Sequence, residues 1–175
     1  DTNASFICGS LSGRNVSFDS DSDDDDNDDH TVEADDQFTY GYLLGLHANG
    51  SVHFLVVVSS TNYASCDGLT LVSDGVYFSG VVAGNFTGDF ASHFSDSQLG
   101  HVGRVVTARG YFAKVFFNGT VDSSLLHVLD AGSYVNVRQL SADANDTLYL
   151  VGDFSGNLTI GNNTLRSLGD HYSSY

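Results

Sequence analysis

The sequence predicts an all-β protein made of tandem four-stranded antiparallel units that carry long inserted loops. Three observations support this fold class: a landmark that recurs at a nearly constant period, short alternating apolar runs, and Gly-containing turns between those runs. The chain has 175 residues, of which 41% are hydrophobic, with 12 Phe and 9 Tyr. This is enough apolar surface for one globular core, so we expect a single β-repeat domain.

The repeat has a period of 71 to 72 residues. Residues 6–13 recur as 77–84 and again as 149–156, each time ending in Gly-x-x-x-Gly. A second landmark, residues 41–52, recurs as 110–121, which lies 69 residues further along. Two independent landmarks in one order indicate an internal duplication.

Within one unit, the local pattern is that of four short strands. Residues 69–72 and 76–80 are short apolar or alternating runs, and a Ser-Asp-Gly turn joins them into a predicted hairpin. Residues 111–117 are rich in aromatic and β-branched side chains and lead into an Asn-Gly pair, which favours a second hairpin. Residues 122–129 are the one stretch whose spacing also fits a short helix. We predict strands throughout.

Four strands per unit, with an insertion between the second and third, are typical of a β-propeller blade that carries a loop. We assign a partial blade to residues 1–66, a full blade to 67–133 and a partial blade to 134–175. The first insertion contains an acidic loop at residues 19–36, and its counterpart in the second unit spans 91–108. Propellers close with about four to eight blades, so these units would form an incomplete ring.

The same segments resemble a known repeat family. Residues 147–167, TLYLVGDFSGNLTIGNNTLRS, and residues 110–115, GYFAKV, are similar to the SBBP-type β-propeller repeats of extracellular and cell-surface proteins. The similarity extends over nearly the whole chain in about two and a half copies. The family usually has Trp after the turn of the last strand, whereas this chain has Phe54 in one unit and Ser123 in the other. The resemblance implies a fold and an extracellular setting, but no chemistry.

The charge of the chain excludes several partners. It has 22 acidic and 6 basic residues, a formal net charge of −16 and a pI near 4.2. Such a surface repels nucleic acid and anionic lipid, so neither is expected as a partner. The longest apolar runs, such as residues 54–58, are far shorter than the roughly 20 residues of a spanning helix, so we expect no membrane insertion.

Half of the acidic residues lie in the loop at residues 19–36. A run of like charges repels itself, and we expect a solvated loop there. The alternating aspartates make calcium the one candidate ion, although the EF-hand pattern fails because Asp24 and His30 stand where Gly and Glu are required. No other cofactor is expected. The candidate calcium ligands are Asp19, Asp21, Asp23 and Asp25.

Acceptor sites for N-linked glycans are unusually frequent. Eight of the 12 Asn residues begin an Asn-x-Ser/Thr triplet, where chance would give about two or three. The excess predicts a heavily N-glycosylated extracellular glycoprotein, either secreted or at the cell surface; accidental matches in a Ser- and Asn-rich β protein are the alternative. Several triplets recur in the same repeat positions, so we expect their turns to face water. The acceptors are Asn3, Asn15, Asn49, Asn85, Asn118, Asn145, Asn157 and Asn162.

The chain has two cysteines, Cys8 and Cys66. In an oxidising compartment we expect them to form a disulfide that closes a loop of about 59 residues. In the chain-entropy description, this bond would stabilise the fold by about 4 kcal/mol. A pair of buried free thiols is the alternative. No Cys/His cluster indicates zinc.

Signals for catalysis are missing, and we predict that the protein is not an enzyme. Residues 9–13 resemble a nucleophile elbow, but Leu11 stands at the nucleophile position. The seven histidines show neither an H-E-x-x-H motif nor another short metal-binding spacing.

Both ends of the repeat stop part-way through a unit, so we expect unpaired strands at both ends. Contacts between the head of one copy and the tail of another would complete them and form a ring or a filament. We therefore predict a structural subunit that polymerises with copies of itself into a filament or cell-surface appendage. The alternatives are a segment of a longer propeller and a glycan- or calcium-binding adhesion module. Candidate ligand contacts of such a module are Tyr40, Tyr42, Tyr111, the acidic loop and residues 91–108.

Overall fold

The computed structural model describes residues 4–13, 16–18, 30–32, 38–87, 108–168 and 173–174. Its regular elements are β-strands, and these ranges contain no helix, in agreement with the all-β prediction. Residues 122–129, which also fitted a helix, form part of a strand. The described ranges hold no helix of the length and apolarity that a membrane crossing requires.

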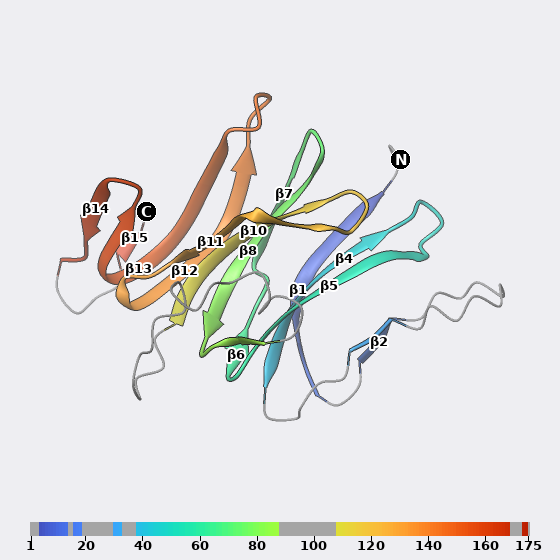
Figure 1. Ribbon diagram of the computed structural model, residues 1–175, viewed down its shortest axis with the longest axis horizontal. Coiled ribbons are helices and arrows are strands. Elements are labelled where there is room, and N and C mark those ends of the chain that lie inside the picture. Colours follow the sequence, from blue (N-terminus) through green and yellow to red (C-terminus); the bar gives the residue numbers. More distant parts are fainter. Residues whose placement is uncertain are drawn as a thin grey trace.

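The strands fall into three regions, which we call units 1, 2 and 3 (Figure 1). Unit 1 consists of β1 (Ser5–Ser12), β2 (Val16–Phe18), β3 (His30–Val32), β4 (Thr39–Leu46) and β5 (Val52–Ser60). Unit 2 consists of β7 (Gly68–Val72), β8 (Gly75–Ala83), β9 (Phe86–Thr87), β10 (Ala108–Phe116) and β11 (Val121–Leu129), and β6 (Tyr63–Ala64) precedes it. Unit 3 consists of β12 (Gly132–Ala142), β13 (Leu148–Ile160), β14 (Asn163–Arg166) and β15 (Ser173–Ser174).

Strand pairing repeats from unit to unit. In unit 2, the strands β7, β8, β10 and β11 pair antiparallel in that order. In unit 1, β1, β4 and β5 pair in the order of β8, β10 and β11. Gly9 lies opposite Tyr42 in the first unit, and Gly80 lies opposite Tyr111 in the second. The duplication found in the sequence is therefore also present in the register of the strands.

Short segments lead from each unit into the next, and we call residues 63–67 the first crossing and residues 134–138 the second crossing. Tyr63 in the first crossing pairs parallel with β4 and antiparallel with β8. Tyr134, at the equivalent position of the second crossing, pairs parallel with β10 and antiparallel with β13. Because of these parallel bridges, the sheet is mixed, whereas we had predicted antiparallel pairing only.

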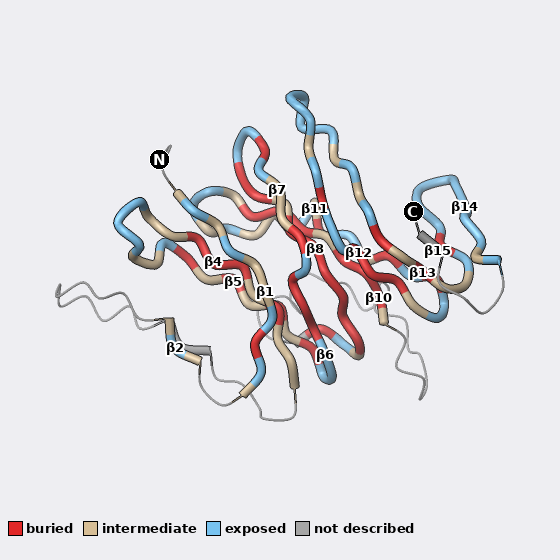
Figure 2. The backbone as a smooth tube through the Cα atoms, turned by 180° about the vertical axis from the view of Figure 1, so that it is seen from behind, coloured by how far each residue is buried: buried red, intermediate tan, exposed pale blue. Residues whose placement is uncertain are grey.

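Thirteen of the described strands belong to one large sheet that does not close on itself, and β2 and β3 form a separate hairpin. Unit 2 lies between the other two units, as Figure 1 shows. Along β8, Phe78 points into a core shared with unit 1, while its neighbour Tyr77 packs against a core shared with unit 3. Figure 2 accordingly shows burial concentrated along β8 and β10.

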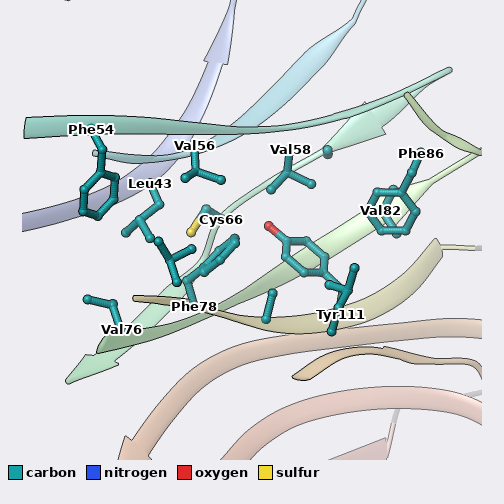
Figure 3. Packing of buried hydrophobic residues seen from close by; sticks show 14 residues of the cluster. Leu43, Phe54, Val56, Val58, Cys66, Val76, Phe78, Val82, Phe86 and Tyr111 are labelled. Carbon is teal, nitrogen blue, oxygen red and sulfur yellow. The ribbon is translucent and has the colours of Figure 1, made fainter. Parts of the chain in front are cut away.

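The core between units 1 and 2 is built from residues of both units. Tyr111 and Phe78 meet edge to face, with ring centroids 5.9 Å apart. The Tyr111 hydroxyl donates a hydrogen bond to the Ser65 carbonyl, 2.7 Å away, so the buried phenol is satisfied. Figure 3 shows Tyr111 among aliphatic side chains of both units, with Cys66 nearby. The labelled members of this cluster are Leu43, Phe54, Val56, Val58, Cys66, Val76, Phe78, Val82, Phe86 and Tyr111.

The two glycines of the repeated Gly-x-x-x-Gly motif are favoured for different physical reasons. Its first glycine in unit 2, Gly80, lies beneath the first crossing, and a Cβ there would come within 1.9 Å of the Ser65 carbonyl oxygen. Its second glycine has a positive φ in each unit, at Gly13, Gly84 and Gly156. Residues with a side chain rarely adopt that backbone region, so glycine is favoured there. Gly13 and Gly84 directly follow the ends of β1 and β8, whereas β13 continues beyond Gly156.

Candidate functional site

The strand β1 lacks one of the neighbours that its equivalent in unit 2 possesses. β8 has β10 on one side and β7 on the other. β1 pairs with β4, and no second strand pairs with it in the described part of the chain. Eight of the nine residues of β8 are buried, but only one of the eight residues of β1. Ile7 is 44% exposed, whereas its equivalent Phe78 is completely buried.

The strand β13 of unit 3 lacks the opposite neighbour. It pairs with β12, it pairs with β14 only over Asn157–Ile160, and it meets β15 only at Asp153 and Phe154. Among the described residues, no strand occupies the place along 148–152 that β10 occupies along β8. Tyr149 and Val151 are each 54% exposed there. In Figure 1, β1 and β13 lie in the two outer units, on opposite sides of unit 2.

Both strands are chemically suited to further pairing. Natural sheets usually protect an edge with Lys, Pro or a bulge. β1 and residues 148–152 contain no charged side chain, and the whole chain contains no Pro. The outer face of unit 1 is partly covered by the β2–β3 hairpin, where the rings of Phe18 and Tyr42 lie 5.5 Å apart. The β2–β3 hairpin does not pair with β1.

The glycan acceptors that fall within the described residues are all exposed. Five of them lie in turns or bends or next to one, Asn157 lies within β13 where it pairs with β14, and none is in β1 or in residues 148–152. The turns after β10 and β12 lie at the same end of the sheet because these strands run parallel. Asn3 and Asn15 lie outside the described residues. The exposed acceptors are Asn49, Asn85, Asn118, Asn145, Asn157 and Asn162.

The hairpin turns after β4 and β10 share one geometry. In the first, Gly50 has a φ of 87° and its N–H donates to the His47 carbonyl. Asn49 Oδ1 accepts hydrogen bonds from the backbone N–H and the hydroxyl of Ser51, at 3.1 and 2.8 Å. In the second, Asn118 Oδ1 accepts the backbone N–H of the residue two positions on, at 3.0 Å. Each acceptor asparagine therefore lies at an exposed hairpin tip.

The turn after β12 has the same shape, but different residues stabilise it. Asp146 takes the glycine position with a φ of 59°. The Asp143 carboxylate accepts the backbone N–H of Asn145 and of Thr147, at 2.9 and 3.0 Å. These bonds favour the ionised form, so the pKa of Asp143 is lowered. The turn that carries the acceptor Asn145 therefore depends on a charge, unlike the two glycine-containing turns.

The two cysteines lie together even though they are far apart in the sequence. Cys8 is on β1, and Cys66 is in the first crossing. The backbone N–H of Cys66 donates a hydrogen bond to the Gly9 carbonyl, 3.3 Å away. Both thiols are free and lie at more than disulfide distance. Burial raises the pKa of Cys66, and the neighbouring Cys66 side chain lowers the pKa of Cys8. The predicted pairing partners are neighbours, and the bond itself stays a prediction.

Other candidate ligand residues do not gather into a site. Tyr111 is completely buried in the core, so its prediction as a ligand contact is wrong. The imidazoles of His47 and His53 lie 4.4 Å apart, and His53 Nε2 lies 2.8 Å from the Phe117 carbonyl oxygen. No group of three His, Cys, Asp or Glu side chains able to hold a metal occurs in the described ranges. The candidate calcium ligands Asp19, Asp21, Asp23 and Asp25, and residues 91–107, lie outside those ranges.

No protein-family model matches the chain, and no curated protein matches it. The similarity to SBBP-type repeats therefore stays a prediction from the residues. Sequence reasoning expected open ends, but it did not single out Ile7, Tyr149 or Val151. The repeat alignment contained the signal, because Ile7 stands where Phe78 is a core residue.

Proposed function

We propose that this protein is a structural subunit of an extracellular, N-glycosylated assembly in which β13 of one copy pairs with β1 of the next. The observation that carries the proposal is that two strands equivalent to β8 each lack one neighbour. Among the described strands, none pairs with β1 in the place of β7. None pairs with residues 148–152 of β13 in the place of β10, because β15 pairs with β13 only at Asp153 and Phe154. The two vacant edges are on opposite sides of the equivalent strands. Pairing one with the other is therefore a head-to-tail contact, which propagates as a filament or closes as a ring.

The apolar residues at the two edges support a copy of the same chain as the partner. Ile7 at one edge and Tyr149 and Val151 at the other are exposed, and strand pairing would remove them from water. Neither edge carries charge, so a protein of net charge −16 would meet itself at places without local repulsion. The backbone supplies the hydrogen bonds, as in β-strand addition generally.

The placement of the glycan acceptors supports the same reading. The described acceptors are exposed, all but Asn157 lie in turns or bends or next to one, and none occurs in β1 or in residues 148–152. Glycans there would cover the ends of the strands and leave the edges accessible. Blade-like units arranged in this way would form a surface appendage that glycans shield from other contacts, while the edges remain specific for other copies.

The experiment uses the protein secreted from a glycosylating host and studied by sedimentation velocity and electron microscopy. The native chain should form larger species as its concentration rises through the micromolar range. Ile7→Lys and Val151→Lys should each weaken association by at least about tenfold. Pairing of β13 with β1 of another copy would bury the charge of the introduced lysine. Leu71→Lys is the matched control, since Leu71 is 55% exposed but lies on β7 in the complete unit.

Mixing the two edge variants tests the direction of the contact. The Ile7→Lys variant keeps an intact β13, and the Val151→Lys variant keeps an intact β1. An equimolar mixture should therefore form a heterodimer that cannot extend, whereas either variant alone should stay monomeric. A native chain that stays a monomer at micromolar concentration, or a Leu71→Lys variant that associates as weakly as the edge variants, would overturn the proposal.

A further inference from the structure

We infer that Cys8 and Cys66 form an intramolecular disulfide that ties the edge strand β1 to the first crossing. The inference rests on the extracellular location in the proposed function, since an oxidising compartment is needed. Cys8 packs against the core cluster that contains Cys66. The backbone of the first crossing is also anchored beside Cys8, because Cys66 N–H donates to the Gly9 carbonyl.

The second crossing shows that this contact belongs to the architecture of the repeat. Ser79 of β8 is the equivalent of Cys8, and Val137 in the second crossing is the equivalent of Cys66. The Ser79 hydroxyl donates to the Val137 carbonyl at 3.1 Å, and both residues are completely buried. At each crossing, the same position of the strand therefore touches the same position of the crossing segment. Only the first crossing has cysteine at both.

The surroundings assign different roles to the two sulfur atoms. Cys8 is half-buried and its pKa is lowered, so its thiolate can attack a small disulfide oxidant from solvent. That attack forms a mixed disulfide at Cys8 and releases one thiolate of the oxidant. The Cys66 sulfur then attacks the Cys8 sulfur, and the second thiolate leaves with the Cys66 proton. Two thiols are oxidised and one disulfide is reduced to two thiols.

The disulfide would hold in place a strand, β1, that has few neighbouring strands. β1 pairs with β4 alone among the described strands, and most of its residues are at least partly exposed. A covalent link to the first crossing holds β1 against unit 2 and closes a loop that contains the acidic insertion. The vacant edge would then be presented in a fixed position, which lowers the entropy cost of adding a strand from another copy.

The first test is a peptide map of secreted, enzymatically deglycosylated protein under non-reducing conditions. Trypsin cleaves after Arg14, which separates Cys8 in residues 1–14 from Cys66 in residues 15–104. The bond predicts one linked species that reduction splits into these two peptides, and an intact mass lower by two hydrogen atoms. Complete alkylation of both cysteines in unreduced, denatured protein would overturn the inference.

The second test measures thermal unfolding with and without reductant. Reduction should lower the Tm of the native chain by about 10 °C. Cys8→Ser should lower it similarly, and reductant should then have no further effect. A native Tm that reductant leaves unchanged would contradict the bond. Both tests work equally on monomeric protein, so failure of the assembly proposal leaves this inference standing, and an assembly of fully reduced chains would refute only this inference.

Discussion

β1 and β8 are equivalent strands of one duplicated unit, yet β1 has one buried residue of eight and β8 has eight of nine. β8 has a strand on each side and a packed unit on each face, whereas β1 has one strand partner in the described chain. Ile7 and Phe78 occupy the same place in the repeat and differ completely in exposure. The comparison shows that the neighbours of a strand, rather than its own pattern, decide whether its apolar residues become core or surface.

Replacing the equivalent glycines Gly80 and Gly9 by alanine should give the largest difference in stability between the two strands. In Gly80→Ala, the added Cβ would lie 1.9 Å from the Ser65 carbonyl oxygen, which is held in the first crossing. The Cβ of Gly9→Ala would meet the end of the Tyr42 side chain at 2.9 Å, which can move. We expect Gly80→Ala to destabilise the protein by more than about 3 kcal/mol and Gly9→Ala by under about 1.5 kcal/mol. Urea unfolding measures both, and equal losses would show that the two environments are alike.

Truncating the equivalent apolar residues should give a smaller but parallel contrast. Phe78→Ala removes a fully buried ring that packs against Tyr111, and we expect a loss of about 3–5 kcal/mol. Ile7→Ala removes a side chain that is 44% exposed, and we expect a loss under about 1 kcal/mol in the monomer. Chemical denaturation at low protein concentration, where copies do not associate, is the measurement. A large loss of unfolding free energy for Ile7→Ala would mean that the β1 edge is already covered in the monomer.

The two crossings can be made alike by adding cysteines to the second. Ser79→Cys combined with Val137→Cys places thiols at the positions equivalent to Cys8 and Cys66. If the crossings share one geometry, a second disulfide should form and raise the Tm by a few degrees, about 5 °C after the loss of Val137 packing. Non-reducing mass spectrometry detects the bond. Two cysteines that stay reduced in oxidising buffer would show that the crossings differ in geometry.

The smallest predicted effect compares the three hairpin turns. The lowered pKa of Asp143 lies below its ordinary value of 3.8, because the N–H groups of Thr147 and Asn145 bond the carboxylate. Its stabilisation is therefore present above that ordinary value and is lost as the pH falls through the lowered pKa. The amide NMR signals of Asn145 and Thr147 should shift in acid, while those of Ser51 and Thr120, which donate to neutral side chains, stay in place. Asp143→Asn should abolish the shift; movement of all four signals together would contradict this.

The local elements could be predicted because the residues that specify them are close in sequence. The Ser-Asp-Gly turn between β7 and β8 and the Asn-Gly turn between β10 and β11 were both predicted, and both hairpins are present. The crossings were not predicted, because Tyr63 finds its partners through contacts with strands that are distant in sequence. Tyr111 was proposed as a ligand contact, but its strand pattern cannot say on which side another unit packs.

The sequence by itself determined the β-strands, their turns, the duplicated period and the positions of the glycan acceptors. Periodicity, turn chemistry and repetition act over a few residues or recur along the chain, so one sequence displays them directly. Only the tertiary structure decided which strands were covered and where the crossings lay. These features depend on which units pack against each other, and the same strand pattern is buried in β8 and exposed in β1.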